Sequence, residues 1–212
     1  MGREFVDLFN HWAETYDATV SGMDEEYKEV FEGYGTILQG VVEKIHGSVV
    51  EFGVGTGNLT RLLAAKADHV LGVEPSEKMR EEAVKKLVAI DIVPGDFLHF
   101  PVPERPIDAI VSSYAFHHLT DEEKAKATSL YASLLNTGGK VVFADTMFTN
   151  KQQHQALIQE AIDRHFLNLA TDLQTEYYTT IPILTSLFEE AGFSVSFTQM
   201  NKYVWMLEAV KK

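Results

Sequence analysis

Apolar residues recur along this chain with two alternating periods. Short apolar runs typical of strands lie near residues 48–53, 69–74, 90–93, 107–112 and 140–145. Between these runs, apolar residues recur three or four positions apart, as on the buried face of a helix. Because parallel neighbouring strands need a crossover connection, this alternation predicts an α/β fold with a mostly parallel sheet.

The segments on either side of this core carry further patterns. Helical spacing over residues 5–16 and 23–45 predicts two helices before the sheet, and a stripe within residues 147–180 predicts a helical insertion after the fifth strand. A closing helix with Pro182 in its first turn is expected next. Two apolar runs around residues 199–202 then predict an antiparallel hairpin at the end of the chain.

Local signals mark several helix ends. Ser76 precedes one periodic run, and Thr120 with Glu123 forms the pattern of a capping box. The sequence Asn-Thr-Gly-Gly at residues 136–139 is expected to end that helix and to turn into the fifth strand.

The first strand runs into a turn with glycine at every second position, Gly53, Gly55 and Gly57. Glycine has no Cβ and tolerates positive φ angles, so the backbone of such a turn lets a ligand come close. The second strand ends in Glu74, and an acid about 20 residues beyond the glycine turn suits a ribose-diol acceptor in a βαβ nucleotide site. The turn therefore predicts a nucleotide-type ligand.

Polar residues follow the other strands as well. In an open parallel sheet, ligands bind beyond the carboxyl ends of the strands at the switch point, here expected between the first and fourth strands. Candidate residues at such ends are Gly53, Glu74, Asp96, Ser112 and Asp145.

Four motifs in this order resemble those of class I S-adenosylmethionine (AdoMet) methyltransferases. They are Glu-Phe-Gly-Val-Gly-Thr-Gly at 51–57, Val-Glu-Pro-Ser at 73–76, Gly-Asp-Phe at 95–97 and Ser-Ser-Tyr-Ala-Phe-His-His-Leu at 112–119. The flanks, including Trp-Ala-Glu-Thr-Tyr-Asp at 12–17, more narrowly resemble small methyltransferases of the YrrT type. The resemblance implies a Rossmann-like class I methyltransferase fold, with a mostly parallel seven-stranded sheet, an antiparallel C-terminal strand and N-terminal lid helices.

A single methyltransferase domain is expected over residues 1–212. Its parts are N-terminal helices and lid (1–45), an AdoMet-binding core (46–146), the helical insertion (147–180), and the closing helix with the hairpin (181–212).

The resemblance implies AdoMet as cofactor, and AdoMet makes separate demands on its site. Glu74 is expected to accept hydrogen bonds from the ribose diol, and Asp96 one from the adenine amino group. Glu51 contributes negative charge for the cationic methionyl end. The remaining expected contacts are Gly53, Gly55, Gly57, Met79, Phe97, Ser112 and Tyr16, the last as part of a lid with Trp12 and Asp17.

Methyl transfer from a sulfonium cation is an in-line displacement. The protein needs mainly to align the acceptor within about 3 to 3.5 Å of the methyl carbon and to exclude water. His117 and His118 are the candidates for a general base, with at most one expected to face the site. Tyr16, Tyr114, Tyr177 and Tyr178 are candidates for lining the acceptor pocket.

Composition narrows the class of partner. The net charge of −13 opposes nonspecific attraction to nucleic acid, and no apolar stretch approaches the roughly 20 residues of a membrane span. The amino terminus lacks the apolar region of a signal peptide, so a cytoplasmic location is expected. There is no cysteine, and no HxxH or HExxH spacing occurs, so we expect no metal site. A small-molecule methyl acceptor fits best.

Two alternatives remain at this stage. A nicotinamide-dependent oxidoreductase would need the GxGxxG turn and usually a Tyr-x-x-x-Lys pair, and the chain has neither. A noncatalytic AdoMet-binding protein stays open, because methyl transfer requires no obligatory catalytic side chain.

Overall fold

The computed structural model describes residues 16–87 and 89–212. Within them, the strands form one seven-stranded sheet of order β3-β2-β1-β4-β5-β7-β6. The strands are β1 Ser48–Phe52, β2 His69–Val73, β3 Asp91–Val93, β4 Ile107–Ser113, β5 Leu135–Thr146, β6 Phe193–Gln199 and β7 Val204–Lys211. Pairing is parallel from β3 to β5, while β7 runs antiparallel to both β5 and β6. The predicted Rossmann-like sheet with a reversed C-terminal strand is confirmed.

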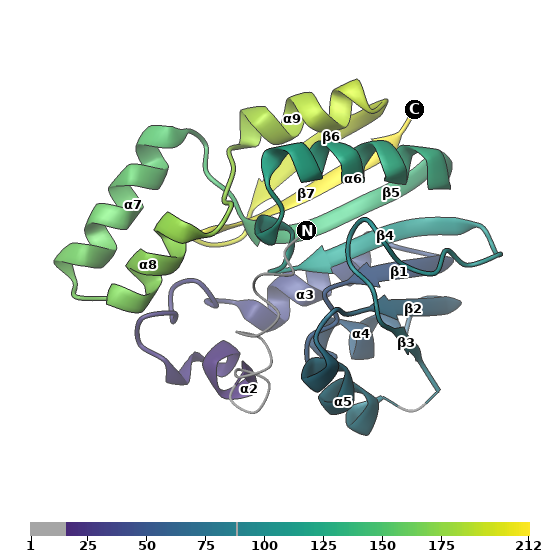
Figure 1. Cartoon of the computed structure of the whole chain (residues 1–212), viewed down its shortest axis with the longest axis horizontal. Coiled ribbons are helices and arrows are strands. Elements are labelled where there is room, and N and C mark those ends of the chain that lie inside the picture. Colours follow the sequence, from purple (N-terminus) through teal and green to yellow (C-terminus); the bar gives the residue numbers. More distant parts are fainter. Residues whose placement is uncertain (1–15, 88) are drawn as a thin grey trace.

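Helices cover both faces of this sheet (Figure 1). One face carries α3 and α4, and the other carries α6 and α9. The helical segments are α2 Tyr16–Ala18, η2 Thr19–Met23, α3 Tyr34–Glu43, α4 Asn58–Leu63, α5 Glu77–Lys86, η3 Phe116–His118, α6 Asp121–Leu134, α7 Lys151–Asp163, α8 Leu167–Thr175 and α9 Ile181–Glu190. No helix in the described part of the chain is long and apolar enough to cross a membrane.

The predicted helix starts are confirmed by their hydrogen bonds. Ser76 Oγ accepts from the backbone N–H of Met79 at 3.2 Å. Thr120 Oγ1 accepts from Glu123 N at 3.3 Å, and Glu123 Oε2 accepts from Thr120 N at 3.1 Å, which completes the capping box. Pro182 lies in the first turn of α9, where its missing N–H leaves no helical bond unmade.

The expected helix over residues 23–45 is wrong in its first half. Only Tyr34–Glu43 is helical, and residues 24–33 form turns. Gly22, near the end of η2, and Gly33, just before α3, take φ angles of +85° and +73°. A right-handed helix cannot include these angles, so it is interrupted on each side of this stretch. Its apolar side chains, such as Tyr27 and Val30, still pack into the core below α3.

The turn expected at residues 136–139 differs as well. Helix α6 does end at Leu134, but β5 begins at once with Leu135. The pairing of β4 with β5 shifts register between Ile107 and Ala109, so the glycine-containing stretch forms an irregularity within the strand pair.

Two helices, α7 and α8, lie between β5 and α9 in sequence, as the helical stripe predicted. They pack against each other and lie beyond the carboxyl end of β4 (Figure 1). A bridge between Phe148 and Thr180 joins the two ends of this segment. It therefore borders the carboxyl edge of the sheet, where β1 and β4 meet at the predicted switch point.

Candidate functional site

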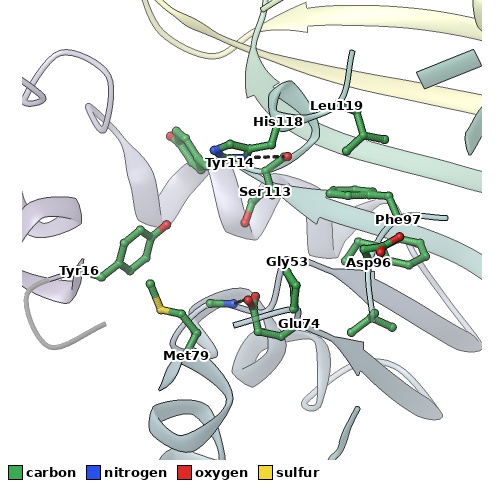
Figure 2. Close-up of a pocket in the computed structure, with 15 residues that line it drawn as sticks. Tyr16, Gly53, Glu74, Met79, Asp96, Phe97, Ser113, Tyr114, His118 and Leu119 are labelled. Carbon is green, nitrogen blue, oxygen red and sulfur yellow. Dashed lines mark hydrogen bonds between the residues drawn. The ribbon is translucent and has the colours of Figure 1, made fainter. Parts of the chain in front are cut away.

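A cavity opens at the carboxyl edge of the sheet (Figure 2). It collects residues from the ends of β1, β2 and β4, from the loop after β3, from α5 and from α2. Its lining residues are Tyr16, Phe52, Gly53, Gly55, Val73, Glu74, Pro75, Met79, Asp96, Phe97, Ser113, Tyr114, Ala115, His118 and Leu119. Eight of the twelve candidate residues therefore meet at one site: Tyr16, Gly53, Gly55, Glu74, Met79, Asp96, Phe97 and His118.

The three glycines of the turn differ in what surrounds them. All have positive φ, but a Cβ on Gly53 would lie 2.7 Å from Ala115 Cβ, whereas at Gly55 the nearest neighbour is Tyr16 Cε1 at 4.0 Å. Gly57 does not line the cavity. A Cβ there would lie 2.7 Å from Leu87 Cδ1, so Gly57 allows α4 to start close against the end of α5.

Glu74 joins the glycine turn to the end of β2. Its Oε2 accepts from Gly55 N at 2.9 Å and its Oε1 from Ser76 N at 2.8 Å. Burial raises the pKa of the Glu74 carboxyl, while these two N–H groups oppose that shift. Each carboxylate oxygen has a second lone pair, so Glu74 can still accept from a ligand's hydroxyl groups.

The loop after β3 forms an adjoining wall. Asp96 Oδ1 accepts from Leu98 N and His99 N, each at 2.9 Å, which holds the loop in a tight turn. Phe97 stacks on Phe52 with ring centroids 5.1 Å apart. With buried Met79 across from them, these side chains make a largely apolar pocket with one acid at its edge.

Tyr16 closes the cavity beside Gly55 (Figure 2). Burial, with Tyr34 and Tyr114 nearby, raises the pKa of the Tyr16 hydroxyl well above its ordinary value. The next residue, Asp17, accepts from Thr56 Oγ1 at 2.6 Å, Asn58 Nδ2 at 3.1 Å and Lys86 Nζ at 2.5 Å. This segment is thus tied directly to the glycine turn. Trp12 lies outside the described residues.

His117 and His118 lie in different surroundings. His118 lines the cavity, and its Nδ1 is 2.9 Å from Ala115 O. His117 lies behind it, with Nδ1 2.5 Å from Asp145 Oδ1 and Nε2 3.3 Å from Glu176 Oε2. Although burial opposes it, Asp145 and Glu176 raise the pKa of His117 to about 10, whereas burial and His117 lower that of His118. Of the two, only His118 lies at the cavity wall.

Glu51 and Ser112 lie beneath the turn and do not line the cavity. Both are buried, and neither the two carboxylate oxygens of Glu51 nor Ser112 Oγ makes a hydrogen bond within the described part of the chain. Burial raises the pKa of Glu51 to about 8, and the charge of Glu74 adds to the shift.

The three described tyrosines proposed to line the acceptor pocket beside Tyr16 lie in different surroundings. Tyr114 lines the cavity, Tyr178 stacks on His117 with centroids 4.8 Å apart, and Tyr177 is 37% exposed and does not line the cavity. Sequence reasoning missed Glu176, because it lies in a polar stretch of the insertion with no motif. The apolar lining residues Val73, Pro75, Ala115 and Leu119 were missed as contacts, although each sits within a motif named above.

The sheet order, the glycine turn and the acid after β2 define a Rossmann-like fold of the methyltransferase class. Residues 49–139 match the family described as "Methyltransferase domain". A protein of Anoxybacillus flavithermus (strain DSM 21510 / WK1), named "Uncharacterized methyltransferase", is 56% identical over 212 residues and is matched over 100% of both chains. The chain belongs to this family of methyltransferases.

Solved structures resemble this one at lower identity. The DhpI–SAH complex is 20% identical with a TM-score of 0.71, over 100% of this chain and 97% of that one. Magnesium protoporphyrin IX methyltransferase (ChlM) from Synechocystis PCC 6803 with bound SAH is 19% identical with a TM-score of 0.68, over 97% and 99%. These likenesses show the fold that the three proteins share.

Proposed function

We propose that this methyltransferase uses AdoMet and methylates a small molecule by in-line displacement. One observation carries the proposal: the Gly53–Gly55 turn and the Glu74 carboxylate border the same cavity and are joined by the bond from Gly55 N to Glu74 Oε2. The similar structures of DhpI and ChlM were each solved with SAH, the product that AdoMet leaves after methyl transfer. ChlM is named for a porphyrin, which is also a small molecule.

The residues fit AdoMet at each of its parts. Gly53 and Gly55 both line the cavity, and at Gly55 no protein atom lies closer to a Cβ position than Tyr16 Cε1 at 4.0 Å, so the backbone there would be open to the methionyl group. Glu74 would accept from the ribose diol, and Asp96, Phe97 and Met79 would surround the adenine. Glu51 and Ser112 do not line the cavity, but their buried oxygens without hydrogen bonds would add acceptors and negative charge behind the ammonium end.

When bound, AdoMet supplies a methyl group already activated by the sulfonium charge. The chain's own task is then to align the acceptor and to exclude water. Tyr16, held by the Asp17 contacts, covers the turn and keeps water from that side. Tyr114, His118 and Leu119 form the wall where the acceptor would lie.

Calorimetric titration with AdoMet, SAH and NAD tests the cofactor assignment. AdoMet and SAH should compete for one site, and NAD should not bind; failure of the folded protein to bind either AdoMet or SAH would refute the proposal. Incubation with AdoMet and a metabolite pool then tests the reaction. SAH release that depends on the pool supports catalysis, whereas binding without release from any pool supports the noncatalytic alternative.

A further inference from the structure

Three metal-ligand side chains converge behind the acceptor wall. His117 and His118 lie on η3 after β4, and Glu176 follows α8 in the insertion. One ligand atom from each lies within 4.8 Å of the other two. The side chains are only 10%, 8% and 8% exposed, so water has little access to this cluster. The negative charge of a carboxylate buried in this way must be balanced by a proton or by a cation.

The hydrogen bonds that these residues make on the side away from the cluster match those of metal ligands. Each Nδ1 faces an oxygen, Asp145 Oδ1 for His117 and Ala115 O for His118, which directs the Nε2 atoms toward Glu176. Histidines that bind metals almost always donate their other ring N–H to a carboxylate or a backbone carbonyl in this way. Tyr178 Oη donates to Glu176 Oε2 at 2.6 Å and orients that carboxylate.

The separations between each histidine and Glu176 are close to those around one shared ion, while the widest separation within the cluster, up to 4.8 Å, would shorten on binding. His117 Nε2 is 3.3 Å from Glu176 Oε2, and His118 Nε2 is 3.7 Å from Glu176 Oε1. Tetrahedral bonds of about 2.0 to 2.1 Å place two ligand atoms about 3.3 Å apart. A proton on His117 accounts for its position between Asp145 and Glu176, but the 3.7 Å distance from His118 is too long for a strong hydrogen bond. One ion between the two imidazoles and the carboxylate would contact all three side chains.

We propose that His117 Nε2, His118 Nε2 and the Glu176 carboxylate bind one divalent transition-metal ion of the zinc type. This proposal differs from the expectation, drawn from sequence spacing, of no metal site. Three protein ligands leave one tetrahedral position open, as in catalytic rather than structural zinc sites. Because His118 also lines the cavity, the site adjoins the acceptor wall (Figure 2).

A chemical role follows, and it rests on the proposed function. An acceptor hydroxyl or thiol that takes the open position loses its proton to solvent more readily, because the ion stabilises the anion. Its oxygen or sulfur then bonds to the methyl carbon as the carbon–sulfur bond of the sulfonium breaks, leaving SAH. His118 then acts as a ligand, and neither histidine needs to be a general base.

Metal binding is tested on the full chain after removal of metals with a chelator. Co²⁺ should bind with one equivalent and give the visible absorption of a tetrahedral site, and Zn²⁺ should displace it. Glu176→Gln and His117→Gln should each weaken Zn²⁺ binding by about 100-fold or more, and Tyr178→Phe by about 10-fold, measured against a chromogenic chelator. Exposed Glu122→Gln and His69→Gln are the matched controls and should bind like the wild type.

Two results would overturn the metal proposal: no stoichiometric Co²⁺ or Zn²⁺ on the wild-type chain, or unchanged affinity in folded Glu176→Gln. SAH titration of the same samples separates this proposal from the proposed function. Absence of metal binding together with normal SAH binding would refute the metal site alone. Metal binding without any SAH or AdoMet binding refutes the AdoMet site alone and leaves the metal site supported.

Discussion

Glu51 gives the sharpest quantitative prediction. It is 0% exposed within β1, between Gly72 of β2 and Val111 of β4, and its carboxylate makes no hydrogen bond to any described residue. Burial raises its pKa from an ordinary 4.5 to about 8. An ionised carboxylate here is a stability cost that a ligand's cationic end could offset.

The sign of the pH dependence follows from this shift. Because the folded-state pKa is raised, the folded protein binds more protons than the unfolded chain between pH 4.5 and about 8, and stability falls as pH rises through that window. At about 1.36 kcal/mol for each pH unit, the ionised group costs about 3 kcal/mol at pH 7 and about 5 kcal/mol above pH 8. Glu51→Gln keeps the shape and removes the ionisation.

Urea unfolding at pH 5, 7 and 8.5 measures the effect. Glu51→Gln should resemble the wild type at pH 5 and exceed its free energy of unfolding by about 3 kcal/mol at pH 7, with a larger gain at pH 8.5. Exposed Glu122→Gln should stay within about 0.5 kcal/mol of the wild type throughout. Parallel stability curves for Glu51→Gln and the wild type would refute the reasoning. The same variant should bind AdoMet more weakly, although it is more stable.

Other predictions concern the cavity. Gly55→Val should abolish SAH binding in a folded protein. Gly138 also has a positive φ but has no neighbour within 4 Å of a Cβ, so Gly138→Val should strain the backbone similarly and leave SAH binding intact. Calorimetric titration of both variants with SAH measures the difference. Glu74→Ala should weaken AdoMet by about 1.5 to 3 kcal/mol and Asp96→Ala by less, and the reverse order would contradict the division into ribose and adenine roles. Amides of residues 16–22 should exchange more slowly with SAH bound; equal protection in both states would show that Tyr16 is fixed packing rather than a lid.

Much of this fold was readable from local sequence. The strand positions, the Ser76 and Thr120 caps, Pro182 in α9 and the C-terminal hairpin all depend on residues close in sequence, whose periodicity and capping chemistry act over a few positions. The glycine turn followed by Glu74 was readable for the same reason, because one βαβ unit places both at the same edge of the sheet. Those features predicted the class of protein.

Only the tertiary structure decided which of these residues share a site. The end of α5 packs against Gly57, which does not line the cavity, while Gly55 stays open to it. Two glycines with left-handed φ angles interrupt the helix expected over residues 23–45. The approach of Glu176 to His117 and His118 is decided by how the α7–α8 segment folds back across the edge of the sheet. Contacts between residues so far apart depend on chain closure and packing of the whole domain, and no local pattern in the sequence encodes them.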